Sequence, residues 1–306
     1  MKTQHLTSLY DLTPAQLTDL LDRATALKSL FKKGERPQLL QGHVLAQLFE
    51  KPSLRTRNSF ESAMIHLGGG GIFLTTAEAG LNGRESLADV ARVLSSFSDI
   101  ITMRTFSHQL IIDFSGHSSC PVINGLSDER HPCQALTDLL TIREVCGELK
   151  GRHLVFVGDG NNVSMSLAIA CAMTGMKMTL AVPKGFEYGP EFLEELTRRY
   201  PGHQTQQLHD PRKAVATADI VYTDVWASMG QEDDADRRKS AFAEFQVNEA
   251  LMKCAPKSAF FMHDLPAKRG LEVTDDVMEC SQSIVFQQAE NRMHLARGLF
   301  AWLLGK

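Results

Sequence analysis

The sequence predicts an α/β protein built from two doubly wound, parallel-sheet domains joined by crossover helices. Short apolar runs typical of buried strands alternate with segments of helical spacing, and this alternation occurs in two successive series. The length of 306 residues also suits two domains better than one. We expect a first domain over residues 1–135 and a second over 136–287, with a final helix over 288–306 that packs back on the first.

The first series opens with a helix, because Thr13 can cap it and Pro14 suits its first turn. Apolar runs then predict strands at 43–49, 72–74, 100–104 and 121–124. Apolar residues at helical spacing predict helices over 53–66 and 86–96. A long helix beginning at His131-Pro132 and running to Leu149 is expected to cross between the domains.

The second series continues the alternation. Strands are expected at 153–157, 178–182, 220–223, 259–262 and 283–286. Helices are expected at 162–174, 190–199 and 289–304, the last of them carrying apolar residues at helical spacing.

Composition narrows the function classes. The net charge of −4 argues against a general nucleic-acid binder, although local arginines can still bind a small anion. The six cysteines are scattered and form no C-x-x-C pair, which favours free thiols in a reducing compartment. The N-terminal segment lacks the apolar core of a signal peptide, and no apolar run is long enough to span a bilayer. We therefore expect a cytoplasmic protein without a membrane partner.

The sharpest chemical signal is the segment Ser53-Leu54-Arg55-Thr56-Arg57, where the first predicted strand gives way to a helix. Backbone amides and the helix dipole favour an anion at such a position. Two hydroxyls add donors, and two guanidinium groups have the geometry for phosphate oxygens. The alternative is a helix cap followed by solvated arginines, and spacing alone favours the phosphate site only slightly.

Two further helix starts carry polar side chains. At 131–134, His131 could donate to a polarised carbonyl and Gln134 could bind an amide, although a capping or core histidine fits equally well. The turn at 158–163 resembles a dinucleotide-binding loop, but Val163 replaces the third glycine and the next strand ends without an acid. That turn could instead present Asn162 to a small polar ligand.

Three segments after the later strands remain ambiguous on pattern alone. Asp224, followed by Ser228-Met229-Gly230, could hold an ammonium group, although a surface turn fits the pattern better. Residues 263–266 read His-Asp-Leu-Pro just past a strand. Arg292 could bind phosphate or pair with the nearby Glu290.

Taken together and in this order, these segments resemble the carbamoyltransferases, and the ornithine branch most closely. Residues 53–57 match the family's S-T-R-T-R phosphate motif, and residues 131–134 match H-P-x-Q. Residues 224–230 match the D-x-x-x-S-M-G loop that marks the ornithine branch, and residues 159–162 and 290–292 also match. The resemblance covers nearly the whole chain.

The resemblance implies a role for each matched residue. It implies a homotrimer, or a multiple of trimers, that transfers the carbamoyl group of carbamoyl phosphate to L-ornithine without a metal or an organic cofactor. The carbamoyl phosphate site would comprise Ser53, Leu54, Arg55, Thr56, Arg57, Arg104, His131, Gln134, Leu265 and Arg292. The ornithine site would comprise Asn162, Asp224, Ser228 and Met229, and the catalytic groups would be Arg104, His131, Thr56 and Asp264.

Three positions depart from the family pattern. Leu54 replaces a threonine, and Gly80 stands where the ornithine branch has a glutamine that contacts carbamoyl phosphate. Asp264 replaces the cysteine of His-Cys-Leu-Pro, which lies beside the reacting amine in that branch. A carboxylate at this position would favour the protonated ammonium form of the substrate amine, which cannot attack. Two alternatives therefore stay open: a carbamoyltransferase for another amine, and a carbamoyl-phosphate-binding subunit with little turnover.

Overall fold

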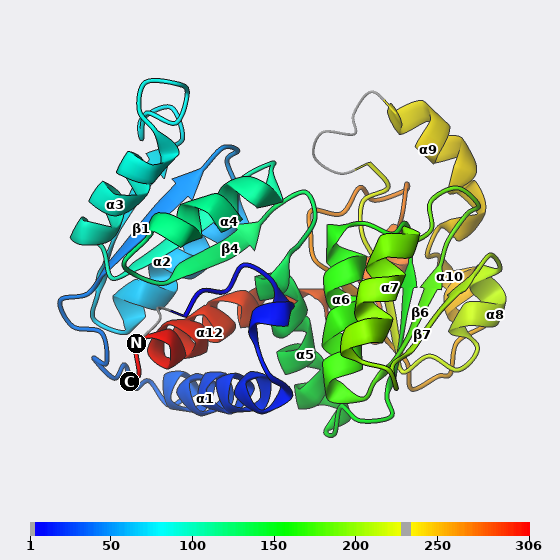
Figure 1. Ribbon diagram of the computed structural model, residues 1–306. Helices are drawn as coiled ribbons and strands as arrows, with labels where there is room; N and C mark the ends of the chain where they lie inside the picture. The colour runs from blue at the N-terminus through cyan, green and yellow to red at the C-terminus, as the bar shows by residue number, and fades with distance from the viewer. Residues whose placement is uncertain (1–3, 228–233) are drawn as a thin grey trace. The chain divides into compact units, whose positions relative to one another are not determined.

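The computed structural model describes residues 4–227 and 234–306, which form two compact units (Figure 1). Unit 1 comprises residues 1–140 and 290–306, and unit 2 comprises residues 141–289. Two helices, α5 (Pro132–Cys146) and α12 (Val285–Leu303), contribute residues to both units. The expected crossover helices are therefore present.

Unit 1 alternates strands and helices after an N-terminal helix. Its elements before α5 are η1 (Leu9–Asp11), α1 (Pro14–Lys32), β1 (Val44–Phe49), α2 (Leu54–His66), β2 (Gly70–Thr75), α3 (Leu87–Phe97), β3 (Ile100–Arg104), α4 (His108–His117) and β4 (Val122–Leu126). As the cap residue of α1, Thr13 accepts a hydrogen bond from the Gln16 backbone N–H. The predicted start of this helix is thus confirmed.

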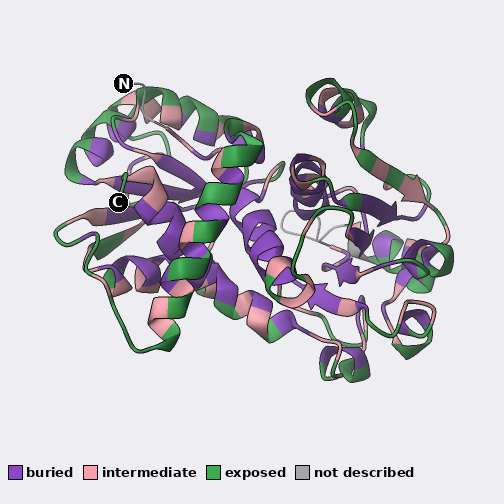
Figure 2. Cartoon of the chain, turned by 90° about the horizontal axis from the view of Figure 1, so that it is seen from below, coloured by how far each residue is buried: buried purple, intermediate pink, exposed green. Residues whose placement is uncertain are grey.

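The sheet of unit 1 is parallel throughout, with the strand order β2-β1-β3-β4. Helices α3 and α4 pack their apolar side chains against one face of β1 and β3. Phe60 of α2 contacts Phe300 of α12, with ring centroids 5.6 Å apart. Strands β1, β3 and β4 are accordingly buried, whereas the edge strand β2 is largely exposed and the helices expose one side (Figure 2).

Unit 2 continues the alternation with a larger sheet. Its elements before α12 are β5 (His153–Val157), α6 (Asn162–Thr174), β6 (Lys177–Ala181), α7 (Pro190–Arg199), β7 (Gln204–Leu208), α8 (Pro211–Val215), β8 (Ile220–Thr223), α9 (Ala235–Ala241), η3 (Ala243–Phe245), α10 (Glu249–Met252), β9 (Phe260–His263) and α11 (Asp275–Met278). The strands are parallel in the order β7-β6-β5-β8-β9. This order confirms a doubly wound sheet with β5 at its centre.

One predicted strand is wrong. Residues 283–286 were expected to form the last strand, but only Ser283 makes an isolated bridge, to Phe261. Helix α12 begins at Val285, four residues before the predicted start. A short apolar run such as Ile284-Val285-Phe286 cannot be assigned by periodicity alone, and here the buried Val285 belongs to a helical turn.

Other elements were not predicted because their sequences carry a weak apolar signal. Strand β7 consists mostly of glutamine and lies at the edge of its sheet, where one side needs no partner strand. Helix α5 also ends three residues before Leu149, because Gly147 adopts a positive φ of 77° that terminates it.

In both sheets, polar side chains follow the strands at the switch point, where the winding direction of the sheet reverses. In a doubly wound sheet, ligands bind at the carboxyl ends of the strands where the winding direction reverses. In unit 1 this point lies between β1 and β3, and Phe49 pairs in register with Arg104. In unit 2 it lies between β5 and β8, and Val157 pairs with Thr223. The fold thus predicts one ligand-binding edge in each unit.

Among the described residues, the structure contains no helix with the length and apolar character needed to cross a membrane.

Helices α1 and α12 approach so closely that one glycine is required between them. A Cβ atom added at Gly298 would lie 2.7 Å from both Cα and Cβ of Ala24. Gly298→Ala should therefore destabilise the protein by about 1–3 kcal/mol, the usual cost of overpacking. Gly116→Ala in α4 is the matched control, because nothing lies within 4 Å of its added Cβ and helix propensity improves by about 0.5–1 kcal/mol. Thermal unfolding of both variants measures the difference, and equal stabilities would contradict the close contact.

Candidate active site

The start of α2 forms an anion-binding terminus in unit 1. Ser53 caps the helix, and its hydroxyl accepts the backbone N–H of Thr56 at 3.4 Å. Helix α2 spans 13 residues, so its dipole and unpaired N-terminal amides favour negative charge at this end. Leu54 is 75% exposed and contributes a backbone amide but no polar side chain. The loss of a hydroxyl at this position leaves the helix terminus intact.

The Thr56 hydroxyl joins three elements of unit 1. It is 3.0 Å from the Ser53 hydroxyl, 3.4 Å from Arg104 Nη1 and 3.0 Å from Arg292 Nη2. Thr56 is buried, while Arg104 ends β3 and Arg292 lies in α12. Two guanidinium groups therefore converge on one oxygen at the helix terminus. We call Thr56, Arg104 and Arg292 the arginine cluster.

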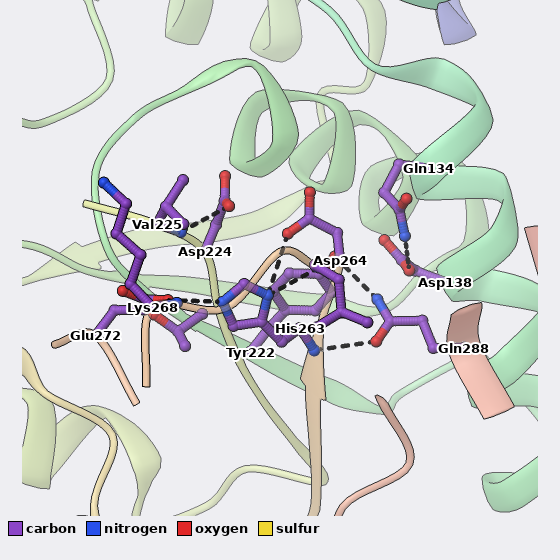
Figure 3. Close-up of polar contacts among 12 residues, drawn as sticks. Gln134, Asp138, Tyr222, Asp224, Val225, His263, Asp264, Lys268, Glu272 and Gln288 are labelled. Carbon is purple, nitrogen blue, oxygen red and sulfur yellow. Dashed lines mark hydrogen bonds and ion pairs between the residues drawn. The ribbon is translucent and has the colours of Figure 1, made fainter. Parts of the chain in front are cut away.

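Gln134 extends the arginine cluster to helix α5. Its side-chain oxygen accepts a hydrogen bond from Arg292 Nη1, and its amide nitrogen donates to Asp138 at 2.8 Å (Figure 3). Both side chains are fully buried. Asp138 fixes the orientation of the amide, so the Gln134 oxygen faces Arg292. This assignment leaves one lone pair of that oxygen for a ligand N–H.

His131 lies beside the arginine cluster in its neutral form. It is almost fully buried at the start of α5. Burial, together with the charges of Arg292 and Arg104, holds its pKa well below the usual value. A neutral imidazole can donate one N–H to a carbonyl without carrying charge. Burial also raises the pKa of Cys133 to about 12, so this neighbouring thiol is unreactive near neutral pH.

Arg57 has its described contacts outside the arginine cluster. Its guanidinium stacks over the Phe73 ring at 3.9 Å and pairs with Glu61 at 3.5 Å. Arg55 is half-buried on the same helix. Gly80 has a φ of 81°, and a Cβ there would approach the Arg84 guanidinium at 3.1 Å. A glutamine at this position would therefore need a different loop conformation.

In unit 2, the turn after β5 is joined to the end of β8. Asn161 caps α6 by accepting the Ser164 N–H, and its amide donates to Asp224 Oδ2 at 3.0 Å. Asn162 follows as the first helical residue. Gly160 is required because an added Cβ would lie 2.9 Å from the backbone of Glu187. Close backbone packing thus explains a glycine that resembled part of a dinucleotide motif.

Asp224 and Asp264 form a buried carboxyl pair. Ligand-type oxygens of the two side chains lie within 4.8 Å of each other, and both residues are shielded from solvent. Burial first, and then the charge of Asp264, raise the pKa of Asp224 well above its usual value. Asp224 also accepts the Val225 N–H at 2.6 Å. Figure 3 shows the Asp264 carboxyl near Asp224 and beside His263.

His263 uses both ring nitrogens within unit 2. Nδ1 accepts the Leu265 N–H at 2.9 Å, and Nε2 lies 3.2 Å from Oε1 of the buried Glu272. A proton on Nε2 satisfies both contacts, because Nδ1 then acts as the acceptor. Leu265 itself has a φ of 58°, an uncommon backbone conformation for a branched residue.

The same cluster brings together atoms that could hold a metal ion. Ligand-type atoms of Asp224, His263 and Asp264 lie within 4.8 Å of one another. However, the Nδ1 lone pair of His263 already accepts a backbone N–H, so this nitrogen would have to break that bond to coordinate a metal. The two carboxyl groups are the more accessible ligands of this group. Ser228 and Met229, predicted to bind the amino acid, lie outside the described residues.

Comparison with known proteins assigns each part of the chain to a domain of one enzyme family. Residues 4–144 match the carbamoyl-P binding domain of aspartate/ornithine carbamoyltransferase, and residues 150–303 match its Asp/Orn binding domain. The chain belongs to the aspartate/ornithine carbamoyltransferase family. The ornithine carbamoyltransferase of Pyrococcus abyssi is 47% identical over 100% of this chain and 97% of its own length.

Solved structures of family members agree with the fold. An ornithine carbamoyltransferase from Pyrococcus furiosus superposes with a TM-score of 0.95 at 45% identity, covering 99% of this chain and 97% of that one. An anabolic ornithine carbamoyltransferase from Campylobacter jejuni superposes with a TM-score of 0.91 at 34% identity, covering 99% of each. The predicted family is confirmed.

Several residues that support the family site were missed by sequence reasoning. Asp138 orients Gln134, Asn161 holds Asp224, and Glu272 accepts from His263. Asp138 could have been found, because it lies one helical turn after Gln134 on the same face. The contacts of Asn161 and Glu272 depend on the loops, and no spacing in the sequence indicates them.

Replacing one carboxyl group of the pair by a neutral amide should stabilise the fold. Because the pKa of Asp224 is raised in the folded state, ionisation of this carboxyl destabilises the fold. The free energy of unfolding should therefore fall as the pH rises from the ordinary aspartate range through that raised pKa. Asp264→Asn removes the repulsion and supplies a donor for Asp224. It should raise the stability at neutral pH by about 1 kcal/mol, or roughly 2–4 °C in Tm, and reduce this pH dependence.

Asp276→Asn, an exposed substitution in the same unit, is the control and should change little. Unchanged or lowered stability of the Asp264 variant at neutral pH would contradict the repulsion between the two carboxyl groups.

Proposed function

We propose that this protein transfers the carbamoyl group of carbamoyl phosphate to the side-chain amine of L-ornithine, giving L-citrulline and phosphate. The observation that carries the proposal is the convergence of Arg104 and Arg292 on Thr56 at the start of α2. Two guanidinium groups at a helix N-terminus form a site suited to a phosphate dianion. The relatives with 45–47% identity are ornithine carbamoyltransferases, which supports the same activity.

The phosphate group is assigned to the start of α2. The amides of residues 54 and 55 and the Ser53 and Thr56 hydroxyls supply neutral donors, and Arg55 and Arg292 supply charge. Arg57 is assigned to the same site at its outer edge, where its guanidinium is held over Phe73. A dianion at this point also offsets the repulsion between the guanidinium groups of the arginine cluster.

The carbamoyl group is assigned to the opposite side of Thr56. The attacking amine adds to the carbonyl carbon, and negative charge grows on the carbonyl oxygen. Arg104, Thr56 and neutral His131 are the donors for that oxygen, and each such prepositioned donor is worth about 3–4 kcal/mol. The Gln134 oxygen and the Leu265 carbonyl are assigned to the carbamoyl amide. The C–O bond to phosphate then breaks, and the departing phosphate accepts the proton of the amine.

The amino acid is assigned to the carboxyl edge of the unit 2 sheet. Asn162 and Asp224 lie at the switch point between β5 and β8, where a doubly wound sheet binds its ligand. Asp224 is assigned to an ammonium group of the substrate, and Ser228 and Met229 complete this side by family resemblance. Asp264 is assigned as the carboxylate that receives a proton from the incoming ammonium group.

The carboxyl pair also supports a second candidate, a carbamoyltransferase for a different amine. A carboxyl at position 264 is more polar and more acidic than the thiol of the family pattern, so it favours a substrate that brings a second positive charge. Ornithine remains the first candidate because its side-chain ammonium already supplies that charge.

We further propose a homotrimer in the cytoplasm. Unit 1 exposes large apolar side chains that a neighbouring subunit would cover, including Leu54 and Phe97, which are 75% and 70% exposed. All six cysteines are free thiols, which suits a reducing compartment. Sedimentation velocity would test the assembly, and a species with the mass of one chain would contradict the trimer.

The Thr56 hydroxyl should be required for carbamoyl phosphate binding. Thr56→Val keeps the shape of the side chain but removes the oxygen shared by Arg104 and Arg292. We expect the affinity for carbamoyl phosphate to fall about 10- to 100-fold, because a hydrogen bond to a charged group contributes about 1.5–3 kcal/mol. Calorimetry measures the affinity. Thr18→Val, at an exposed position of α1, is the control and should bind normally. Normal binding by the Thr56 variant would contradict the assignment.

A colorimetric citrulline assay tests the reaction itself. With saturating carbamoyl phosphate, L-ornithine should be converted to citrulline, and a panel of shorter and longer diamino acids should react more slowly. A higher kcat/KM for another amine would replace ornithine as the substrate. Carbamoyl phosphate binding without turnover of any amine would contradict the enzymatic proposal and favour a binding subunit.

A further inference from the structure

Arg238 of α9 links three segments of unit 2 that sequence motifs did not connect. Its Nη1 donates to Asp159 Oδ2 at 2.6 Å and to the Trp226 carbonyl at 2.8 Å. Its Nε lies 3.5 Å from Asp234 Oδ2. The side chain is only 9% exposed, and its guanidinium lies 5.1 Å from the Phe186 ring centroid. A guanidinium group is suited to this position because its donors form a rigid planar set.

The contacts of Arg238 lead directly to the proposed amino-acid site. Asp159 begins the turn after β5, and its carbonyl accepts the Ser164 hydroxyl at 2.8 Å. The same turn carries Asn161, which donates to Asp224. Trp226 follows Asp224 by two residues, so the hydrogen bond from Arg238 to its carbonyl holds the chain where it leaves β8. Arg238 therefore fixes the backbone on both sides of the Asn161–Asp224 hydrogen bond.

Asp159 shows that this ion pair is held in a dehydrated environment. Burial raises the pKa of the Asp159 carboxyl, and the contact with Arg238 opposes that rise. Removal of the arginine would leave a buried carboxyl without its charged partner, which is costly. The turn at 159–161 would then have to move toward water, and the Asn161–Asp224 contact depends on that turn.

We propose that Arg238 is a positioning residue for the amino-acid substrate: by joining Asp159 to the Trp226 carbonyl, it sets the relative placement of Asn162 and Asp224. This inference rests on the proposed function, because it assigns those two side chains to the substrate. Arg238 touches no substrate itself and acts through the two segments that it joins. Its loss should impair amino-acid binding and leave carbamoyl phosphate binding, which is assigned to unit 1, unchanged.

The neighbouring Arg237 provides a matched control. It lies on the same helix, stacks on the same Phe186 ring at 5.2 Å and pairs with the same Asp234 at 3.5 Å. Its side chain is 69% exposed, and its described contacts include neither Asp159 nor Trp226. Arg237→Met therefore removes the same charge from the same helix without breaking the link proposed here.

The test compares Arg238→Met, Arg238→Lys, Asp159→Asn and Arg237→Met with the wild-type protein in steady-state kinetics. For Arg238→Met we expect the KM for L-ornithine to rise at least about tenfold, because small misplacements of binding groups are costly. The Kd for carbamoyl phosphate should stay within about twofold of the wild-type value. Asp159→Asn should act in the same direction, Arg238→Lys should restore part of the affinity, and Arg237→Met should resemble the wild type.

Amide hydrogen exchange supplies a readout that is independent of turnover. Arg238→Met should increase exchange in peptides that cover residues 159–163 and 224–227 relative to Arg237→Met. If Arg238→Met does not fold, Arg238→Lys and Asp159→Asn carry the same comparison. Absence of citrulline formation by the wild-type protein would overturn the proposed function. The exchange measurement would still show whether Arg238 holds residues 159–163 and 224–227 in place. Wild-type KM values and unchanged exchange in the folded variants would overturn the inference.

Discussion

The candidate active site depends on the convergence of two guanidinium groups on one buried hydroxyl. Arg104 comes from the end of β3 and Arg292 from α12, and both donate to Thr56 in the first turn of α2. Like charges at this spacing repel, and the positive end of the α2 dipole adds to that repulsion. A bound dianion relieves it. Burial first, and then the same field, hold the pKa of His131 well below its usual value, so this imidazole can donate to a carbonyl beside the anion while neutral.

The two units apply one fold principle to substrates of opposite charge. Each is a doubly wound sheet, and each gathers its polar groups at the switch point of the strand order. Unit 1 collects guanidinium groups there, which suits a phosphate ester. Unit 2 collects Asp224 and Asp264, which suit an ammonium group. The carboxyl pair is the clearest departure from the expected family pattern, and burial together with the charge of Asp264 raises the pKa of Asp224 well above its usual value.

Sequence reasoning was strongest where local chemistry determines structure. Helix α6 and strand β3 were predicted at their observed bounds, because a capping Asn161 and a continuous apolar run are local signals. It failed at residues 283–286, where burial decided between helix and strand. The motifs identified Thr56, His131 and Asp224, whereas Asp138, Glu272 and Arg238 were missed. Arg238 acts through Asp159, which is far from it in the chain, and one sequence contains no record of such a contact.

The most direct test is a structure of the protein bound to a phosphonate analogue of carbamoyl phosphate. We expect phosphonate oxygens within hydrogen-bonding distance of the backbone amides at 54 and 55 and of the Arg292 guanidinium. We also expect a carbonyl oxygen that faces Thr56, Arg104 and His131. A phosphonate bound elsewhere, with the start of α2 occupied only by water and both guanidinium groups still on Thr56, would contradict this assignment.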